Sequence, residues 1–166
     1  MASTTASTGS LPALGAAERE QAGEALQATL VDLVDLSLVG KQLHWSVVGP
    51  LFRPLHLHLD EMIDAWRDLA DTVAERAVAL AYWPDGQAEA VVGAAGGRLE
   101  RGPIADRSVV EELVSRLSGA SERARAGMER LSELDSASED VLVEVVRTLE
   151  EQLWMVRAQL PISGGA

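Results

Sequence analysis

The 166-residue sequence contains no cysteine and only one Phe, one Tyr and one lysine, Lys41. The absence of cysteine excludes disulfide bonds, thiolate metal sites and cysteine nucleophiles. The shortage of Phe and Tyr is unfavourable for a β-sandwich and fits a helical protein better. Acidic residues outnumber basic ones by 26 to 14, giving a formal charge of −12. Such a charge argues against a broad basic face for nucleic acid or anionic membrane and is compatible with attracting cations.

The length and the apolar fraction of 47% predict one globular domain with its own core. Residues 1–17 carry no charge and lack the basic start and apolar run of a secretory signal, so we expect a flexible N-terminal tail. Residues 161–166 are expected to form a short C-terminal tail after the domain at 18–160. No stretch approaches eighteen uncharged apolar residues, so no membrane span is expected.

Four stretches have apolar residues at steps of three and four, the period of an amphipathic helix. They predict an all-α protein with helices over about 18–48, 52–80, 108–134 and 138–160. The expected inward-facing residues include Leu26, Leu30, Leu33, Val34, Leu55, Leu59, Met62, Ile63, Trp66, Leu69, Ala70, Val73, Ala77, Val110, Leu113, Val114, Leu117, Ala124, Met128, Leu131, Leu142, Val145, Val146, Leu149, Leu153, Val156 and Leu160.

The links between these helices predict the topology. A Gly-Pro pair ends the first helix, and the short link makes the first two helices antiparallel neighbours. Residues 81–107 form a long connection, with a possible short helix at 88–92, that can cross the length of a bundle. The last helix is expected to begin with a capping box formed by Ser136 and Glu139. The order predicts a ferritin-like four-helix bundle with a long crossover.

Candidate ligands gather on one face of the second helix. At 100° per residue, His56, Asp60, Asp71 and Glu75 fall on one stripe, while His44 lies near the end of the first helix. Each feature has an ordinary explanation, since acidic pairs four residues apart usually form a solvated face and isolated histidines are usually structural. Their convergence favours a metal site. None of the three histidines has Glu three residues before it, so a di-iron centre inside one bundle is not expected.

If the His56/Asp60 pair and the Asp71/Glu75 pair bind the same metal, the helix geometry requires a second chain. Asp60 and Asp71 are separated by about 16 Å along the helix, whereas metal–ligand bonds are about 2 Å. Two antiparallel copies of the helix would bring His56 and Asp60 of one chain to Asp71 and Glu75 of the other. The two-fold axis would cross between Ala65 and Trp66, with Trp66 as an interface anchor, and each dimer would hold two sites. Imidazole and carboxylate ligands suit Fe(II), Zn(II) or Mn(II).

Segments 41–50, 52–61, 71–76 and 149–160 resemble the Dps family, the DNA-binding proteins from starved cells or mini-ferritins. The resemblance covers about residues 20–160. It implies a homo-dodecameric shell in the cytoplasm, with nucleoid association as an alternative. The shell would oxidise Fe(II), preferably with hydrogen peroxide, store ferric mineral and protect against oxidative damage. Iron would occupy a di-iron or mixed site, with Zn or Mn as alternatives.

The resemblance also implies roles for individual residues. Its ferroxidase pattern takes His44, His56 and Asp60 from one subunit and Asp71 and Glu75 from the two-fold mate.

Four further residues have implied roles, and three of them also have an ordinary explanation. Trp45 would donate electrons or simply pack as an aromatic side chain. Asp135, Glu139 and Asp140 would line an iron-entry pore, although Glu139 and Asp140 also suit a helix N-terminus.

The sequence departs from the family's DNA-binding members in its tails, which carry no Lys or Arg. Binding through counterion release needs several cationic contacts, so we expect DNA binding to be weak or absent. Two other interpretations remain at this stage: a nucleoid-compacting structural protein with a vestigial metal site, and a helical scaffold whose acidic stripe is only solvated.

Overall fold

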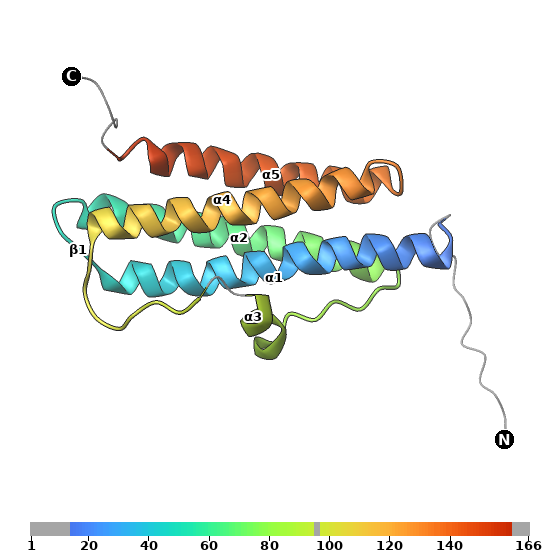
Figure 1. The fold of residues 1–166 in the computed structure, drawn as a ribbon, viewed down its shortest axis with the longest axis horizontal. Coiled ribbons are helices and arrows are strands. Elements are labelled where there is room, and N and C mark those ends of the chain that lie inside the picture. Colours follow the sequence, from blue (N-terminus) through green and yellow to red (C-terminus); the bar gives the residue numbers. More distant parts are fainter. Residues whose placement is uncertain (1–13, 95–96, 161–166) are drawn as a thin grey trace.

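Four long helices pack side by side in a computed structural model that describes residues 14–94 and 97–160 (Figure 1). The elements are α1 (Ala16–Ser46), β1 (Val47–Val48), α2 (Phe52–Ala79), α3 (Ala88–Ala94), β2 (Ile104–Ala105), α4 (Asp106–Leu131) and α5 (Ser136–Arg157). The predicted all-α architecture with a long crossover is confirmed. Among the described residues, no helix combines the length and apolar character needed to cross a bilayer.

The bundle consists of two hairpins, α1 with α2 and α4 with α5, that pack on each other around one apolar core. Almost all the expected inward residues are buried or packed partly buried against this core. Trp66 is fully buried, and its Nε1–H donates to Oε1 of Gln152 at 2.7 Å. The prediction that Trp66 anchors an interface is therefore wrong: the side chain points into its own subunit and joins α2 to α5.

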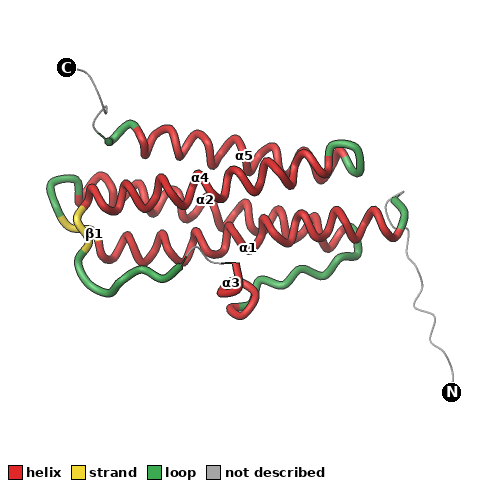
Figure 2. Tube along the Cα trace, viewed as in Figure 1, coloured by secondary structure: helices red, strands yellow, loops and turns green. Residues whose placement is uncertain are grey.

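The crossover runs beside α1, against which α3 packs (Figure 2). Its end contains β2, which pairs in parallel with β1 through Val47↔Ile104 and Val48↔Ala105. The sequence predicted only a connection here, because two-residue strands are too short to show an alternating pattern. The short pairing matters because it ties residues 104–105 to the turn between α1 and α2.

Several helix ends differ from their expected places. The helix α1 begins two residues before the expected start at residue 18, and α4 ends at Leu131, three residues early. At α5 the N-cap is Asp135, whose side chain accepts a hydrogen bond from the Ser138 backbone N–H at 3.2 Å. The predicted capping box at Ser136 and Glu139 is wrong by one position. Residues 1–13 and 161–166 of the predicted tails lie outside the described residues.

Candidate metal centre

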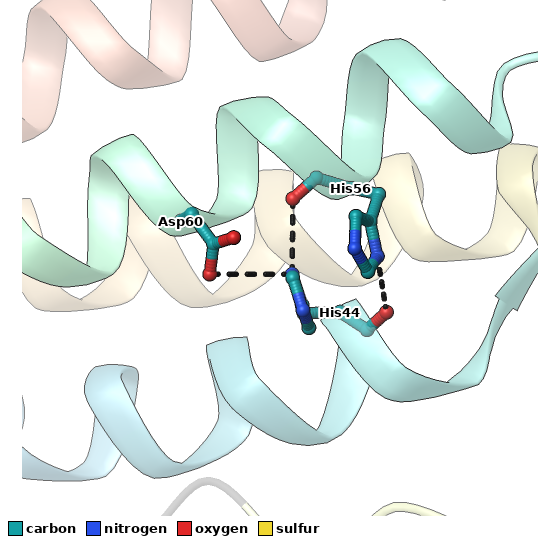
Figure 3. A group of neighbouring side chains, drawn as sticks. All are labelled: His44, His56 and Asp60. Carbon is teal, nitrogen blue, oxygen red and sulfur yellow. Dashed lines mark hydrogen bonds and ion pairs between the residues drawn. The ribbon is translucent and has the colours of Figure 1, made fainter.

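A three-residue group lies where the last turn of α1 meets the first turns of α2. His44, His56 and Asp60 each offer a ligand atom, and these atoms lie within 4.8 Å of one another (Figure 3). The chain reverses direction over residues 47–51, which brings the two histidines together although they are twelve residues apart. The structure thus unites, within one chain, three of the five predicted ligands.

The two imidazoles hold each other in place. His44 Nδ1 lies 2.9 Å from the carbonyl oxygen of His56, and His56 Nδ1 lies 3.1 Å from that of His44. The rings stack with centroids 3.6 Å apart. A carbonyl oxygen only accepts, so each Nδ1 donates its hydrogen, and in a neutral ring Nε2 then keeps the lone pair that binds a metal. Backbone bonds that fix the tautomer are a usual support for metal-binding histidines.

Asp60 already has a cationic partner. Lys41 Nζ donates a hydrogen bond to Asp60 Oδ1, and His44 Nδ1 lies 3.4 Å from the same oxygen. The hydrogen bond from Lys41 holds the pKa of the Asp60 carboxyl below its usual value of 3.8, outweighing a desolvation that acts the other way. The carboxylate is therefore ionised and available to a cation. Any metal that it binds must compete with the Lys41 ammonium.

Asp71 and Glu75 lie further along α2 and are exposed. They are not members of the three-residue group. Because α2 is a single helix over Phe52–Ala79, the separation of about 16 Å between Asp60 and Asp71 still applies. The place of Asp71 and Glu75 in a two-fold mate's site stays a prediction.

Trp45 directly follows His44 and is 71% exposed. At that exposure it does not pack into the core of its own subunit. Its role as an electron donor stays a prediction.

The three acidic residues proposed for a pore are in different environments. Asp135 accepts hydrogen bonds from Ser138 and from Arg76 Nη2, the latter at 2.6 Å. Burial would raise the pKa of the Asp135 carboxyl, but the bonds from Ser138 and Arg76 together hold it below its usual value. Asp135 therefore caps α5 and ties it to α2. Glu139 is half-buried, Asp140 is exposed, and a pore role for any of the three stays a prediction.

Sequence reasoning missed two neighbours of the site. The ring of Phe52 lies 5.1 Å from that of His56. Asp106, at the start of α4, accepts a hydrogen bond from the backbone N–H of Leu51 in the turn between the two histidines. No local pattern marks Asp106, because it is 55 residues from Leu51 in the sequence.

Comparison with known proteins agrees with this architecture. The Ferritin-like domain family matches residues 23–161. Over 159 residues the chain is 33% identical to the DNA protection during starvation protein of Mycolicibacterium smegmatis, covering 93% of this chain and 85% of the relative. Over 158 residues it is 35% identical to the fine tangled pili major subunit of Haemophilus ducreyi, covering 93% and 82%. The solved structure of DpsA14 from Streptomyces coelicolor superposes with a TM-score of 0.88 at 34% identity, covering 96% and 95%.

The helical order, the long crossover and these matches define a ferritin-like protein, and the predicted fold class is confirmed. Within that class the chain belongs to the Dps family. The resemblance noted from segments 41–50, 52–61, 71–76 and 149–160 is therefore confirmed as well.

Proposed function

We propose that this chain is the subunit of a mini-ferritin that oxidises and stores iron. Fe(II) is bound at sites shared by two subunits across a two-fold axis and is oxidised, preferably by hydrogen peroxide. The ferric product is kept as mineral inside a homo-dodecameric shell, which protects the cell from oxidative damage. The observation that carries the proposal is the arranged group of His44 from α1 with His56 and Asp60 from α2, the helix that also presents Asp71 and Glu75.

The chemistry needs two irons and one oxidant molecule. Each Fe(II) loses one electron, and the two electrons break the O–O bond of hydrogen peroxide and reduce both oxygens to the level of water. Hydrolysis of the two Fe(III) ions to oxyhydroxide then releases protons. Because both electrons are taken from a pair of irons, no single-electron cleavage to a hydroxyl radical is required.

The residues supply binding and charge for this reaction. Nε2 of His44 and of His56 are the imidazole donors, because their Nδ1 atoms are used in backbone hydrogen bonds. Asp60 adds a carboxylate when it exchanges Lys41 for the ion. Asp71 and Glu75 of the mate would add two more carboxylates, which favour the higher charge of Fe(III). The net charge of −12 on each chain supports attraction of Fe(II) to the shell.

Removal of the second carboxylate pair tests the proposal. We expect Asp71→Ala/Glu75→Ala to slow peroxide-driven ferric absorbance by about a hundredfold or more, because losing even a partner that only orients a ligand costs roughly tenfold to a hundredfold. The matched control is Glu20→Ala/Glu24→Ala, an exposed pair of the same spacing and charge on α1. It lies about 30 Å from His44 along that helix and should oxidise iron at the wild-type rate. If Asp71→Ala/Glu75→Ala oxidises iron at the same rate as the wild type and the control, the ferroxidase assignment is wrong.

We further propose that the assembled protein binds DNA weakly or not at all. Neither tail carries a Lys or Arg, and each chain adds a net charge of −12 to the assembly. Binding driven by counterion release is strongest at low salt, so an electrophoretic mobility shift at low salt and neutral pH is the most sensitive measurement. We expect no retardation of duplex DNA, and clear retardation would contradict this part of the proposal.

A further inference from the structure

The turn between the two histidine-bearing helices is held from outside by Asp106, the first residue of α4. Asp106 Oδ2 accepts a hydrogen bond from the backbone N–H of Leu51 at 2.8 Å, and Oδ1 accepts one from the N–H of Arg107 at 2.8 Å. Leu51 is the N-cap of α2. One carboxylate therefore joins the N-terminal end of α2 to the N-terminal end of α4.

The turn is built to receive this carboxylate. Gly49 has a φ of +129°, a conformation that residues with a Cβ rarely adopt. A Cβ added at Gly49 would lie 2.6 Å from Asp106 Oδ2, closer than such atoms can approach. Just before Gly49, β1 pairs with β2 of the crossover, two residues that immediately precede Asp106. The end of the crossover thus holds the turn through the β1–β2 backbone pairing and through the Asp106 side chain.

The turn at residues 47–51 affects the relative position of the two imidazoles. His44 lies three residues before β1, and His56 lies five residues after Leu51. Their stacking and their reciprocal backbone bonds require the last turn of α1 and the first turn of α2 to keep one separation. Packing of α1 on α2 holds the two helices along their length, and residues 47–51, which link them, hold their adjoining ends.

We propose that Asp106 is a positioning residue for the metal centre. In the described part of the chain Asp106 makes no hydrogen bond to His44, His56 or Asp60, and it acts by fixing residues 47–51, so that the two imidazoles keep their relative position. This role rests on the proposed function, because it concerns the same site. A looser turn populates the binding geometry for only part of the time, and the apparent metal affinity falls in proportion to that fraction.

The test compares Asp106→Ala, which removes the acceptor, with Asp106→Asn, which keeps an oxygen that can accept from Leu51. Glu111→Ala is the matched control, since Glu111 is an exposed carboxylate on α4 whose partner in the described part of the chain is Arg107 of the same helix. Two quantities are measured on the assembled protein without iron: amide hydrogen exchange over residues 47–55, and Co(II) affinity from its visible absorption. The second quantity reports on ligand geometry, which a purely structural role would not change.

In Asp106→Ala we expect exchange over residues 47–55 to accelerate and Co(II) affinity to fall, each on the order of tenfold, as for the loss of a hydrogen bond to a charged acceptor. Asp106→Asn should stay close to the wild type and Glu111→Ala should match it. If Asp106→Ala does not fold, Gly49→Ala is used instead: its Cβ displaces the carboxylate and also strains the turn, so Co(II) affinity should fall by at least as much.

Unchanged Co(II) affinity in Asp106→Ala would overturn the proposal, and so would a loss in Asp106→Asn as large as that in Asp106→Ala. The proposed function fails in a different way. In that case the wild type binds Co(II) but does not oxidise Fe(II), while the Co(II) and exchange results still decide the role of Asp106.

Discussion

Mixing two inactive variants should restore iron oxidation. The first variant, His56→Ala/Asp60→Ala, lacks ligands of one half-site, and the second, Asp71→Ala/Glu75→Ala, lacks those of the other. In a two-fold pair containing one copy of each, one site has lost both halves and the other is complete. Random pairing makes about half of all pairs mixed, so about one quarter of the sites should be intact. We therefore expect about one quarter of the wild-type rate of ferric absorbance from mixed assemblies.

This result would follow only from a site shared between chains. If one chain supplied all five ligands, every site in a mixture would still lack a pair and the rate would stay at that of the parents. The separation of about 16 Å between Asp60 and Asp71 on one helix argues against that arrangement. Co-expression of the two variants with different tags, followed by native mass spectrometry, gives the fraction of mixed assemblies. The assembly control is a mixture of two tagged copies of one variant, which should remain inactive.

The bundle was predictable because its signals are local. Apolar residues recur along each long helix at the helical period, and this pattern identified the core of all four helices without any long-range information. The errors lie where structure depends on contacts far apart in the sequence. The strand pair at residues 47–48 and 104–105 has no local pattern. At the start of α5, both Asp135 and Ser136 are good N-cap residues, and the bond from Arg76 of α2 favours Asp135.

The candidate site divides in the same way. Spacing along one helix placed His56 and Asp60 on a common face, and the short link to α1 brought His44 to them, as the structure has it. The bond from Lys41 to Asp60 joins two helices, so it depends on how α1 packs against α2 and not on spacing along one helix. Asp106 was missed because its contact with Leu51 spans the whole crossover.

The interface prediction for Trp66 conflicted with the place of the same residue in the inward apolar stripe of the second helix, and the stripe was right. Two antiparallel α2 helices related by an axis near residue 65 would meet through the face of α2 that points outward. Trp66 lies beside this axis in the sequence, and a large aromatic there suggested an anchor for the interface. Trp66 instead points inward, where it is fully buried and donates to Gln152 on α5. An interface at the proposed axis would therefore be made by the exposed face of α2, on which residues 64, 67 and 68 lie.

The buried position of Trp66 predicts the largest effect on stability. We expect Trp66→Ala to lower the free energy of unfolding by about 3–5 kcal/mol, the cost of emptying a large aromatic site. Trp66→Phe keeps most of the ring but leaves the Gln152 Oε1 without its donor, at a cost of about 1–3 kcal/mol. Trp83→Phe is the matched control, because Trp83 is 81% exposed, and should change stability by less than about 0.5 kcal/mol.

A double variant separates the hydrogen bond from the packing. In Trp66→Phe/Gln152→Leu no polar atom is left unsatisfied at the contact, so the pair should cost less than the sum of its two single changes. The cycle compares the wild type, Trp66→Phe, Gln152→Leu and the double variant by denaturant unfolding. All four are measured at one fixed subunit concentration, because assembly adds a stabilisation that depends on concentration. Strict additivity, or a Trp66→Phe no less stable than Trp83→Phe, would show that this bond does not hold α2 to α5. If the double variant loses less unfolding free energy than the two single variants together, a buried polar contact as well as the apolar face holds α2 against α5. This is the helix that carries His56, Asp60, Asp71 and Glu75.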